Sequence, residues 1–409
     1  MKQTIRLVIL AAMLALGLPA LTKAQTGASA GECTEENKAK LYTQYYENRK
    51  DHQDVAYDAA KKYLAACPDL PADDVYGKTL KKFVKDYEAA TRKVQFLEAY
   101  DKKNYAEVMT LGKQVLADDP GYVRANILMG YVGYLASLGG NTSLNAESAN
   151  YAKQAIGLLE AGKTPDDWRP FLNKDDALAW LNYSLGYTYL KTVPSDAIPY
   201  FLKAARMESS LKKNPATYYF IAVAYETGPY TRLTDEYNAK FKGQTESPES
   251  KLAQANINQV VDREIDAYAR AVALSTATDA KTQQTRKEWM DRLTELYKYR
   301  NKSETGLNEL VAGILTKPLP DVPMPLTTLP TPPATGATTP VTSPAGTSSG
   351  TATAPPPAPA KPGAILTTPA KTTPAKTTPA KTTTAPKTTT PSTSQTTKPK
   401  PKANHRRRP

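Results

Sequence analysis

Histidine and paired acidic residues are the side chains through which this sequence of 409 residues could carry out acid–base or metal chemistry. It has two histidines, His52 and His405. A Ser/His/Asp triad or a histidine-rich metal site needs histidines placed among other reactive groups, and two isolated residues argue against both. The acidic pairs all precede helical patterns, where carboxylates accept hydrogen bonds from the free amides of the first turn. We therefore expect helix caps, no enzyme activity, no metal and no cofactor. The pairs are Asp73-Asp74, Asp166-Asp167 and Asp175-Asp176.

The run from Gly157 to Thr164 matches the letters of a phosphate-binding loop, G-x-x-x-x-G-K-[ST]. A working loop of this kind follows a strand and opens a helix. Here the residues before Gly157 have a helical pattern, and Pro165 follows the run directly. We expect Gly162 to end a helix and the run to bind no nucleotide.

The first 24 residues have the layout of a cleaved secretory signal. Lys2 and Arg6 precede an apolar run from Leu7 to Leu18, and small residues follow. This run is too short to span a bilayer, and no later run approaches the roughly 20 apolar residues that a spanning helix needs. We expect a periplasmic or secreted protein with no transmembrane segment in the mature chain.

Charge and proline separate the remaining chain into residues 25–316 and a tail, residues 317–409. The tail has nine Lys, three Arg and one Asp, a net charge of +11, and it contains 22 of the 33 prolines. Few of its residues are apolar, so we expect it to be disordered and to bind anionic envelope polymers through charge alone, without specific nucleic-acid binding. A spacer tail, with or without sugars on its threonines, is the alternative. The candidate polyanion-binding residues are Lys371, Lys376, Lys381, Arg406, Arg407 and Arg408.

Two cysteines, Cys33 and Cys67, occur in the exported part of the chain. The patterns at 34–47 and 53–66 predict two helices joined by a short turn, which brings both cysteines to the same end of the hairpin. In an oxidising compartment we expect a disulfide, which would contribute about 3–4 kcal/mol. Two buried free thiols are the alternative.

Helical periodicity extends from Thr34 to Leu315, and no segment has the two-residue period of a strand. The sequence therefore predicts an all-α fold. A long helix is expected at 73–100, and residues from about 227 to 250 form an insertion. Asp119-Pro120 and Asn214-Pro215 are expected to cap helices. Breaks are expected at 68–71, 118–121, 139–141, 162–165, 193–194, 214–215 and 228–229.

The helices at 177–191 and 195–207 contain a spaced pattern of small and large residues. Leu185, Gly186 and Tyr189 follow L-G-x-x-Y, and the second helix follows A-x-x-x-F-x-x-A from Ala197. This pair resembles the tetratricopeptide repeat, and less complete matches extend the resemblance over residues 34–274. The resemblance implies helix-turn-helix units stacked as an α-solenoid over residues 25–316, whose first helices line a concave binding surface.

One face of the helix at 177–191 is aromatic and lies opposite the face that carries the repeat pattern. Large aromatic side chains with polar tips are effective contacts in protein interfaces. Packing of these rings against adjacent repeats is the alternative interpretation. The resemblance places the following residues on the concave surface as groove candidates: Arg124, Tyr131, Tyr134, Trp180, Tyr183, Tyr187, Tyr219 and Glu226.

Taken together, the sequence predicts an exported helical-repeat scaffold that binds a protein or peptide in a concave groove, with a basic tail that tethers it to anionic envelope material. A structural envelope protein whose tail is the functional element is the second interpretation. An enzyme whose site no motif reveals is the third.

Overall fold

The computed structural model describes residues 32–276 and 278–329. By its contacts the chain divides into residues 1–369 and 370–409, and every described residue belongs to the first unit. The regular structure of the described residues is helical throughout, and no strand occurs among them. The all-α prediction is confirmed. The signal peptide, predicted at residues 1–24, lies outside the described residues.

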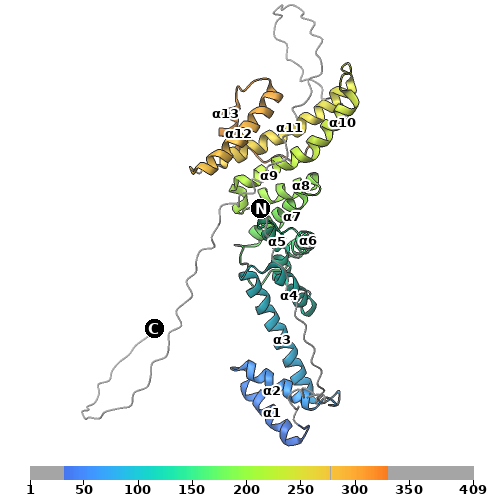
Figure 1. Ribbon diagram of the computed structural model, residues 1–409, viewed down its shortest axis with the longest axis vertical. Helices are drawn as coiled ribbons and strands as arrows, with labels where there is room; N and C mark the ends of the chain where they lie inside the picture. Colours follow the sequence, from blue (N-terminus) through green and yellow to red (C-terminus); the bar gives the residue numbers. More distant parts are fainter. Residues whose placement is uncertain (1–31, 277, 330–409) are drawn as a thin grey trace, which may run out of the picture. The chain divides into compact units, whose positions relative to one another are not determined.

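Consecutive helices pack against each other in pairs, α1 with α2, α3 with α4, α5 with α6 and α7 with α8, while α9 pairs with α11 (Figure 1). In addition α5 contacts α7, and α7 contacts α9. The α-helices are α1 (Glu35–Asn48), α2 (Gln53–Ala66), α3 (Val75–Asp101), α4 (Tyr105–Asp118), α5 (Val123–Leu138), α6 (Asn145–Glu160), α7 (Lys174–Leu190), α8 (Pro194–Arg206), α9 (Pro215–Tyr225), α10 (Thr231–Phe241), α11 (Pro248–Leu274), α12 (Ala280–Asn301) and α13 (Leu307–Gly313).

The hairpin of α1 and α2 begins and ends within one residue of its predicted bounds. The sulfur atoms of Cys33 and Cys67 lie 2.12 Å apart, so the predicted pairing is present. Tyr45 and Tyr63 fill the space between the helices together with three alanines of α2. No helix among the described residues is both long enough and apolar enough to cross a membrane.

Helix ends follow the predicted capping chemistry at several places. Asp74 accepts a hydrogen bond from the backbone of Gly77 at the start of α3, and Asn214 caps α9 ahead of Pro215. Gly162 follows α6 with a φ of +81°, as expected for a glycine that ends a helix. The cap expected at Asp119-Pro120 is wrong, because α5 begins only at Val123. Asp119 instead bonds Lys93.

The break expected at Gly228-Pro229 is also wrong. Helix α9 continues through the π-helical turn η2 (Glu226–Tyr230) into α10 without interruption. A proline lacks the amide hydrogen of a helix interior and its ring crowds the preceding turn, and the wider π turn relieves that crowding. The insertion expected at about 227–250 is therefore helical. It lengthens α9 and α11 into a long hairpin whose outer part is α10 and the start of α11.

Small residues set the distance between paired helices. A Cβ atom added to Gly130 of α5 would lie 2.6 Å from the backbone of Ala152 in α6, and one added to Gly186 of α7 would lie 2.8 Å from the Phe201 ring in α8. Gly186 of the repeat pattern, and Gly130, thus stand where the paired helix leaves no room for a side chain. This agrees with the packing that the pattern implies.

We expect Gly130→Ala to destabilise the fold by roughly 1–3 kcal/mol, because the new methyl group meets helix backbone that cannot move aside cheaply. Gly157→Ala in α6 is the matched control, since nothing lies within 4 Å of its added Cβ. That substitution should stabilise the helix by up to about 1 kcal/mol. Thermal unfolding followed by circular dichroism measures both. Equal melting temperatures for the two variants would contradict the close approach.

Candidate functional site

The aromatic rings that the sequence assigned to an open groove lie in the interior. Tyr134, Tyr183 and Tyr187 are at most 3% exposed. The Tyr134 ring meets the other two edge-on, at centroid distances of 5.5 and 5.2 Å. Because α7 packs against α5, α8 and α9, both of its faces are covered. The structure therefore supports the alternative interpretation for these three rings, namely packing against neighbouring helices.

Four other groove candidates, Arg124, Tyr131, Trp180 and Tyr219, are partly buried. Tyr131 meets Trp180 edge-on at 5.6 Å, and Tyr219 stacks on Trp289 of α12 at 5.0 Å. Arg124 forms an ion pair with Asp167 at 3.0 Å. Each of these side chains is thus engaged by a neighbouring side chain of the described residues.

Glu226, the last groove candidate, is 2% exposed and belongs to a buried polar cluster at the π-helical turn. Its Oε1 accepts a hydrogen bond from Nε of Arg292 at 2.7 Å, and its Oε2 accepts one from the Tyr268 hydroxyl at 3.0 Å. Burial and the nearby Glu226 charge raise the pKa of Tyr268 well above its usual range. Glu226 therefore joins η2, α11 and α12 in the interior, and its side chain does not reach the surface.

Glu264 of α11 lies in the same cluster with 0% exposure, and neither of its carboxyl oxygens has a hydrogen-bond partner among the described residues. Burial, reinforced by the charge of Glu226, raises the pKa of Glu264 well above its ordinary value, although Arg292 opposes the shift. Two close carboxyl groups resemble an acid–base pair, but no solvent reaches Glu264. The described residues contain no group of side chains that suits a metal ion.

Because the folded protein keeps a proton on Glu264 that the unfolded chain releases near pH 4.5, this group favours folding at low pH. Its contribution falls as the pH rises from 4.5 towards the raised pKa, by at most about 1.4 kcal/mol per pH unit. We expect Glu264→Gln to be more stable than the native protein at pH 7, with the difference vanishing below pH 4.5. A difference in melting temperature between the two proteins that stayed constant from pH 4 to 8 would contradict this expectation. The hydroxyl groups of Tyr230 and Tyr268 also lie near the Glu264 carboxyl group.

The surface with the chemistry of a binding site is found elsewhere, under residues 317–329, which we call the strap. The strap follows the short 3-10 turn η3 (Ile314–Thr316) in extended conformation and lies against α8, α9, η2 and α11. The sequence assigned these residues to a disordered tail, so this part of the prediction is wrong. An extended proline segment forms no internal backbone hydrogen bonds, which leaves its carbonyl groups free to bind neighbouring donors.

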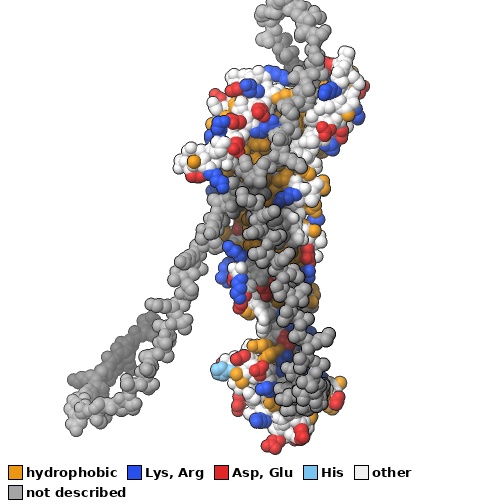
Figure 2. All heavy atoms as spheres, in the orientation of Figure 1, with side chains coloured by type: hydrophobic (Ala, Val, Ile, Leu, Met, Phe, Trp, Pro, Cys, Tyr) orange, Lys and Arg blue, Asp and Glu red, His pale blue; other side chains and the backbone are white. Residues whose placement is uncertain are grey.

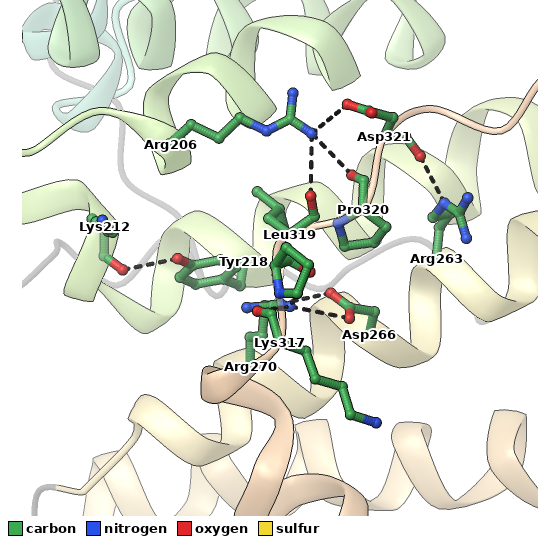
Figure 3. Close-up of polar contacts among 11 residues, drawn as sticks. Arg206, Lys212, Tyr218, Arg263, Asp266, Arg270, Lys317, Leu319, Pro320 and Asp321 are labelled. Atoms are coloured by element: carbon green, nitrogen blue, oxygen red, sulfur yellow. Dashed lines mark hydrogen bonds and ion pairs between the residues drawn. The ribbon is translucent and has the colours of Figure 1, made fainter.

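Arg270 of α11 holds the start of the strap (Figure 3). Its Nη2 donates to the carbonyls of Lys317 at 3.0 Å and Pro318 at 2.9 Å. Its Nε donates to Asp266 of the same helix at 2.6 Å. The Arg270 side chain is only 5% exposed. The ion pair therefore fixes a buried guanidinium in the orientation that presents its remaining donors to the strap.

Two further arginines hold the middle of the strap. Arg263 donates from Nε to the carbonyl of Asp321 at 2.7 Å. Across the strap, Nη2 of Arg206 from α8 contacts the carbonyls of Leu319 and Pro320 and the Asp321 carboxylate, the last at 2.6 Å. Figure 3 shows the strap passing between these two side chains.

Asn256 recognises both sides of Leu326. Its Nδ2 donates to the Leu326 carbonyl at 3.1 Å, and its Oδ1 accepts from the Leu326 amide at 2.7 Å. The carboxamide therefore recognises the backbone of this residue and leaves its side chain to packing. The three α11 residues that bind the strap, Asn256, Arg263 and Arg270, are spaced by seven, which places them in one line along the helix.

The sequence analysis did not identify this row of three donors on α11, although their spacing is visible in the sequence. In α11, polar side chains at positions 256, 263 and 270 share one face of a helix that is otherwise partly apolar. A run of donors at that spacing can follow an extended chain. What the sequence did not reveal is that the chain's own proline-rich residues lie along it.

The groove continues beyond Leu326. A cavity of about 240 Å³ lies beside the strap, lined by Tyr225, Gln259 and the strap residues Val322 to Pro325. A second cavity, of about 320 Å³, shares Leu233 and Asn256 with the first and extends towards the tip of the α10–α11 hairpin. We call the second cavity the tip pocket. Its apolar lining includes Leu233, Tyr237, Phe241, Leu252 and Ala253.

Charges of both signs are interspersed over the described residues on the face shown in Figure 2. This agrees with a net charge of only −1 for residues 24–316 by sequence. The basic residues proposed to bind polyanions, at 371–381 and 406–408, lie outside the described residues. No protein-family model, curated protein or solved structure matches this chain.

Proposed function

We propose that this chain is an exported helical-repeat scaffold that binds an extended segment of a protein partner in the groove of α8, α9 and α11, while its basic tail tethers it to anionic envelope material. One observation carries the proposal: Asn256, Arg263 and Arg270 direct their donors at the backbone of an extended chain. The resemblance to tetratricopeptide repeats supports it, because stacked helix pairs of that family bind peptides. The proposal gives the chain a binding role and no catalytic role.

Recognition through backbone groups suits a groove that must accept a chain in trans. Carbonyl oxygens are common to all peptides, so the same donors serve any segment that can adopt the extended shape. Charge-assisted hydrogen bonds from arginine are stronger than neutral ones. The exposed side chain of Asp321 adds one ion pair, with Arg206.

Capture of envelope proteins by the full mature chain tests the groove. We expect Asn256→Ala combined with Arg263→Ala to abolish the capture of specific partners, because both backbone contacts are lost. The control is Asn301→Ala combined with Arg300→Ala, two exposed α12 residues of the same types that make no strap contact. Excess peptide with the strap sequence should also prevent capture. Partners retained equally by both double variants would rule out this groove as the binding surface.

The tail is tested separately. Its net charge of +11 favours the alternative function, in which the tail is the functional element. A chain that ends at Leu329 keeps the strap and removes only the remaining tail. We expect this chain to retain its groove partners and to lose sedimentation with anionic envelope polymers, which moderate salt should also abolish in the full chain. Loss of every partner on this truncation would instead support a structural protein whose tail is the functional element.

A further inference from the structure

The strap contacts the helices with the periodicity of a polyproline II ligand. Pro320, Pro323 and Leu326 are half-buried, while the residues that flank each of the last two are exposed. A spacing of three residues is one turn of the polyproline II helix, so these three side chains share one face. Leu319 packs against the same core. The strap therefore turns every third side chain towards the helices, as a polyproline II helix would.

The strap does not satisfy all the polar groups of this groove. The Tyr225 hydroxyl and Nε2 of Gln259 are buried without a hydrogen-bond partner among the described residues, and both residues line the cavity beside Val322 to Pro325. Buried polar groups in folded proteins are nearly always paired. The Tyr225 hydroxyl and Nε2 of Gln259 are therefore groups with which an occupant other than the strap could form hydrogen bonds.

The strap also turns away before it reaches the tip pocket. Thr327 and Thr328 form a bend, and Leu329 is 43% exposed. Three residues of polyproline II helix rise about 9 Å. A ligand that continued straight past the position of Leu326 would therefore bring its next inward-facing side chain to the tip pocket. The five apolar or aromatic residues of that pocket would contact this side chain, and Glu236, Lys240, Glu249 and Asn256 complete the lining.

We propose that the groove binds, in trans, a partner segment in the polyproline II conformation with the pattern Pro-x-x-Pro-x-x-Leu-x-x-apolar, and that the strap is a tethered competitor for the same site. This inference rests on the proposed function and names the ligand class. The first three positions of the pattern take the places of Pro320, Pro323 and Leu326. The fourth enters the tip pocket, which the strap leaves open.

A tethered competitor lowers the apparent affinity of the free ligand, because a short tether holds the strap at a high effective concentration. A partner overcomes this competition through the contacts that the strap lacks. The tip pocket and the unpaired groups of Tyr225 and Gln259 provide them.

Fluorescence anisotropy with two labelled peptides tests the inference on the full mature chain. The first peptide has the strap sequence, residues 317–329. The second has proline at the positions of Thr327 and Thr328, which continues the polyproline II helix past the bend. A variant intended to release the strap from the groove, which we call the release variant, carries Pro320→Gly, Pro323→Gly and Leu326→Gly. Its control carries Val322→Gly, Met324→Gly and Thr328→Gly, three exposed strap positions.

We expect the strap peptide to bind the release variant at least tenfold more tightly than it binds the native protein or the control. We expect the proline-extended peptide to bind at least fivefold more tightly than the strap peptide, and Phe241→Ser in the tip pocket to remove that difference. Should the release variant lose helical content, the native chain still provides the test, because the extended peptide must bind it more tightly than the strap peptide does.

Absence of binding of both peptides to a folded release variant would overturn the inference. If envelope partners were still lost on Asn256→Ala with Arg263→Ala, the proposed function would stand and only the ligand class would be wrong. Dimerisation of the native chain by exchange of straps, measured by light scattering, would also overturn the inference, because the occupant would then be a second copy.

Discussion

Glu226→Ala is expected to lower the free energy of unfolding by about 3 kcal/mol, the largest effect of any single substitution considered. The substitution removes the partner of Arg292, whose side chain is only 12% exposed and would then be charged and poorly solvated. It also removes the acceptor of the Tyr268 hydroxyl. Arg292 keeps its second partner, Glu295, so the loss should not exceed the range for breaking a buried ion pair.

In a domain of this size, a change of 3 kcal/mol corresponds to a fall in melting temperature of roughly 6–12 °C. The matched control is Glu295→Ala. Glu295 pairs with the same arginine, but its side chain is 64% exposed, and we expect a loss of at most about 0.5 kcal/mol. Calorimetry on both variants at pH 7 measures the difference. Similar melting temperatures would show that Glu226 is not the buried anchor of the π-helical turn.

Asn256→Ala is expected to weaken binding of the strap peptide to the release variant by roughly 5- to 150-fold. The substitution removes two hydrogen bonds to one residue of the ligand, each worth about 0.5–1.5 kcal/mol. It removes little apolar contact, so the helical content and melting temperature of the protein should change little. Anisotropy with the labelled strap peptide measures the affinity.

Asn301→Ala controls for the loss of an asparagine, because Asn301 bonds only to the backbone of its own helix among the described residues. The release variant that also carries Asn301→Ala should bind the peptide as tightly as the release variant itself. Asn256→Asp adds a finer test. It keeps the acceptor for the Leu326 amide and loses the donor to the Leu326 carbonyl, so its affinity should fall between those of asparagine and alanine. Equal affinity for all of these proteins would place the peptide elsewhere.

Helix positions could be predicted from this sequence because local chemistry determines them. Apolar periodicity and capping residues located α2 at residues 53–66 and placed α7 and α8 within three residues of their bounds. Motif glycines such as Gly186 identified the places where helices approach. The cysteine pair followed from the same hairpin geometry.

The open groove could not be predicted in this way, because the aromatic face of α7 has the same pattern whether a partner or neighbouring helices cover it. Tyr183 and Tyr187 are enclosed because α5 and α9 both reach α7. This is a long-range fact that no single helix shows. The break predicted at Pro229 was wrong for a related reason, since a π-helical turn accommodates a proline that would interrupt a regular α-helix.

The order of the strap could not be predicted from composition, because composition describes a segment without the residues that it packs against. Residues 317–329 have the proline content of a disordered tail, and nothing in them forms a core alone. Their order comes from donors supplied by Arg206, Arg263 and Arg270, three residues that precede the strap by about 50 to 115 positions. A proline-rich segment beside a line of spaced donors is a signal that can be sought in other helical arrays.

Photo-crosslinking tests most directly whether the groove holds a partner's polyproline II segment. A strap peptide with benzoylphenylalanine at the position of Met324 would be irradiated with the release variant, and the crosslinked residues would be mapped by mass spectrometry. We predict crosslinks to Arg232, Leu233 and Gln259, which line the cavity beside Met324, and their loss on Asn256→Ala. Crosslinks confined to α1 to α6, or unchanged by Asn256→Ala, would contradict the account.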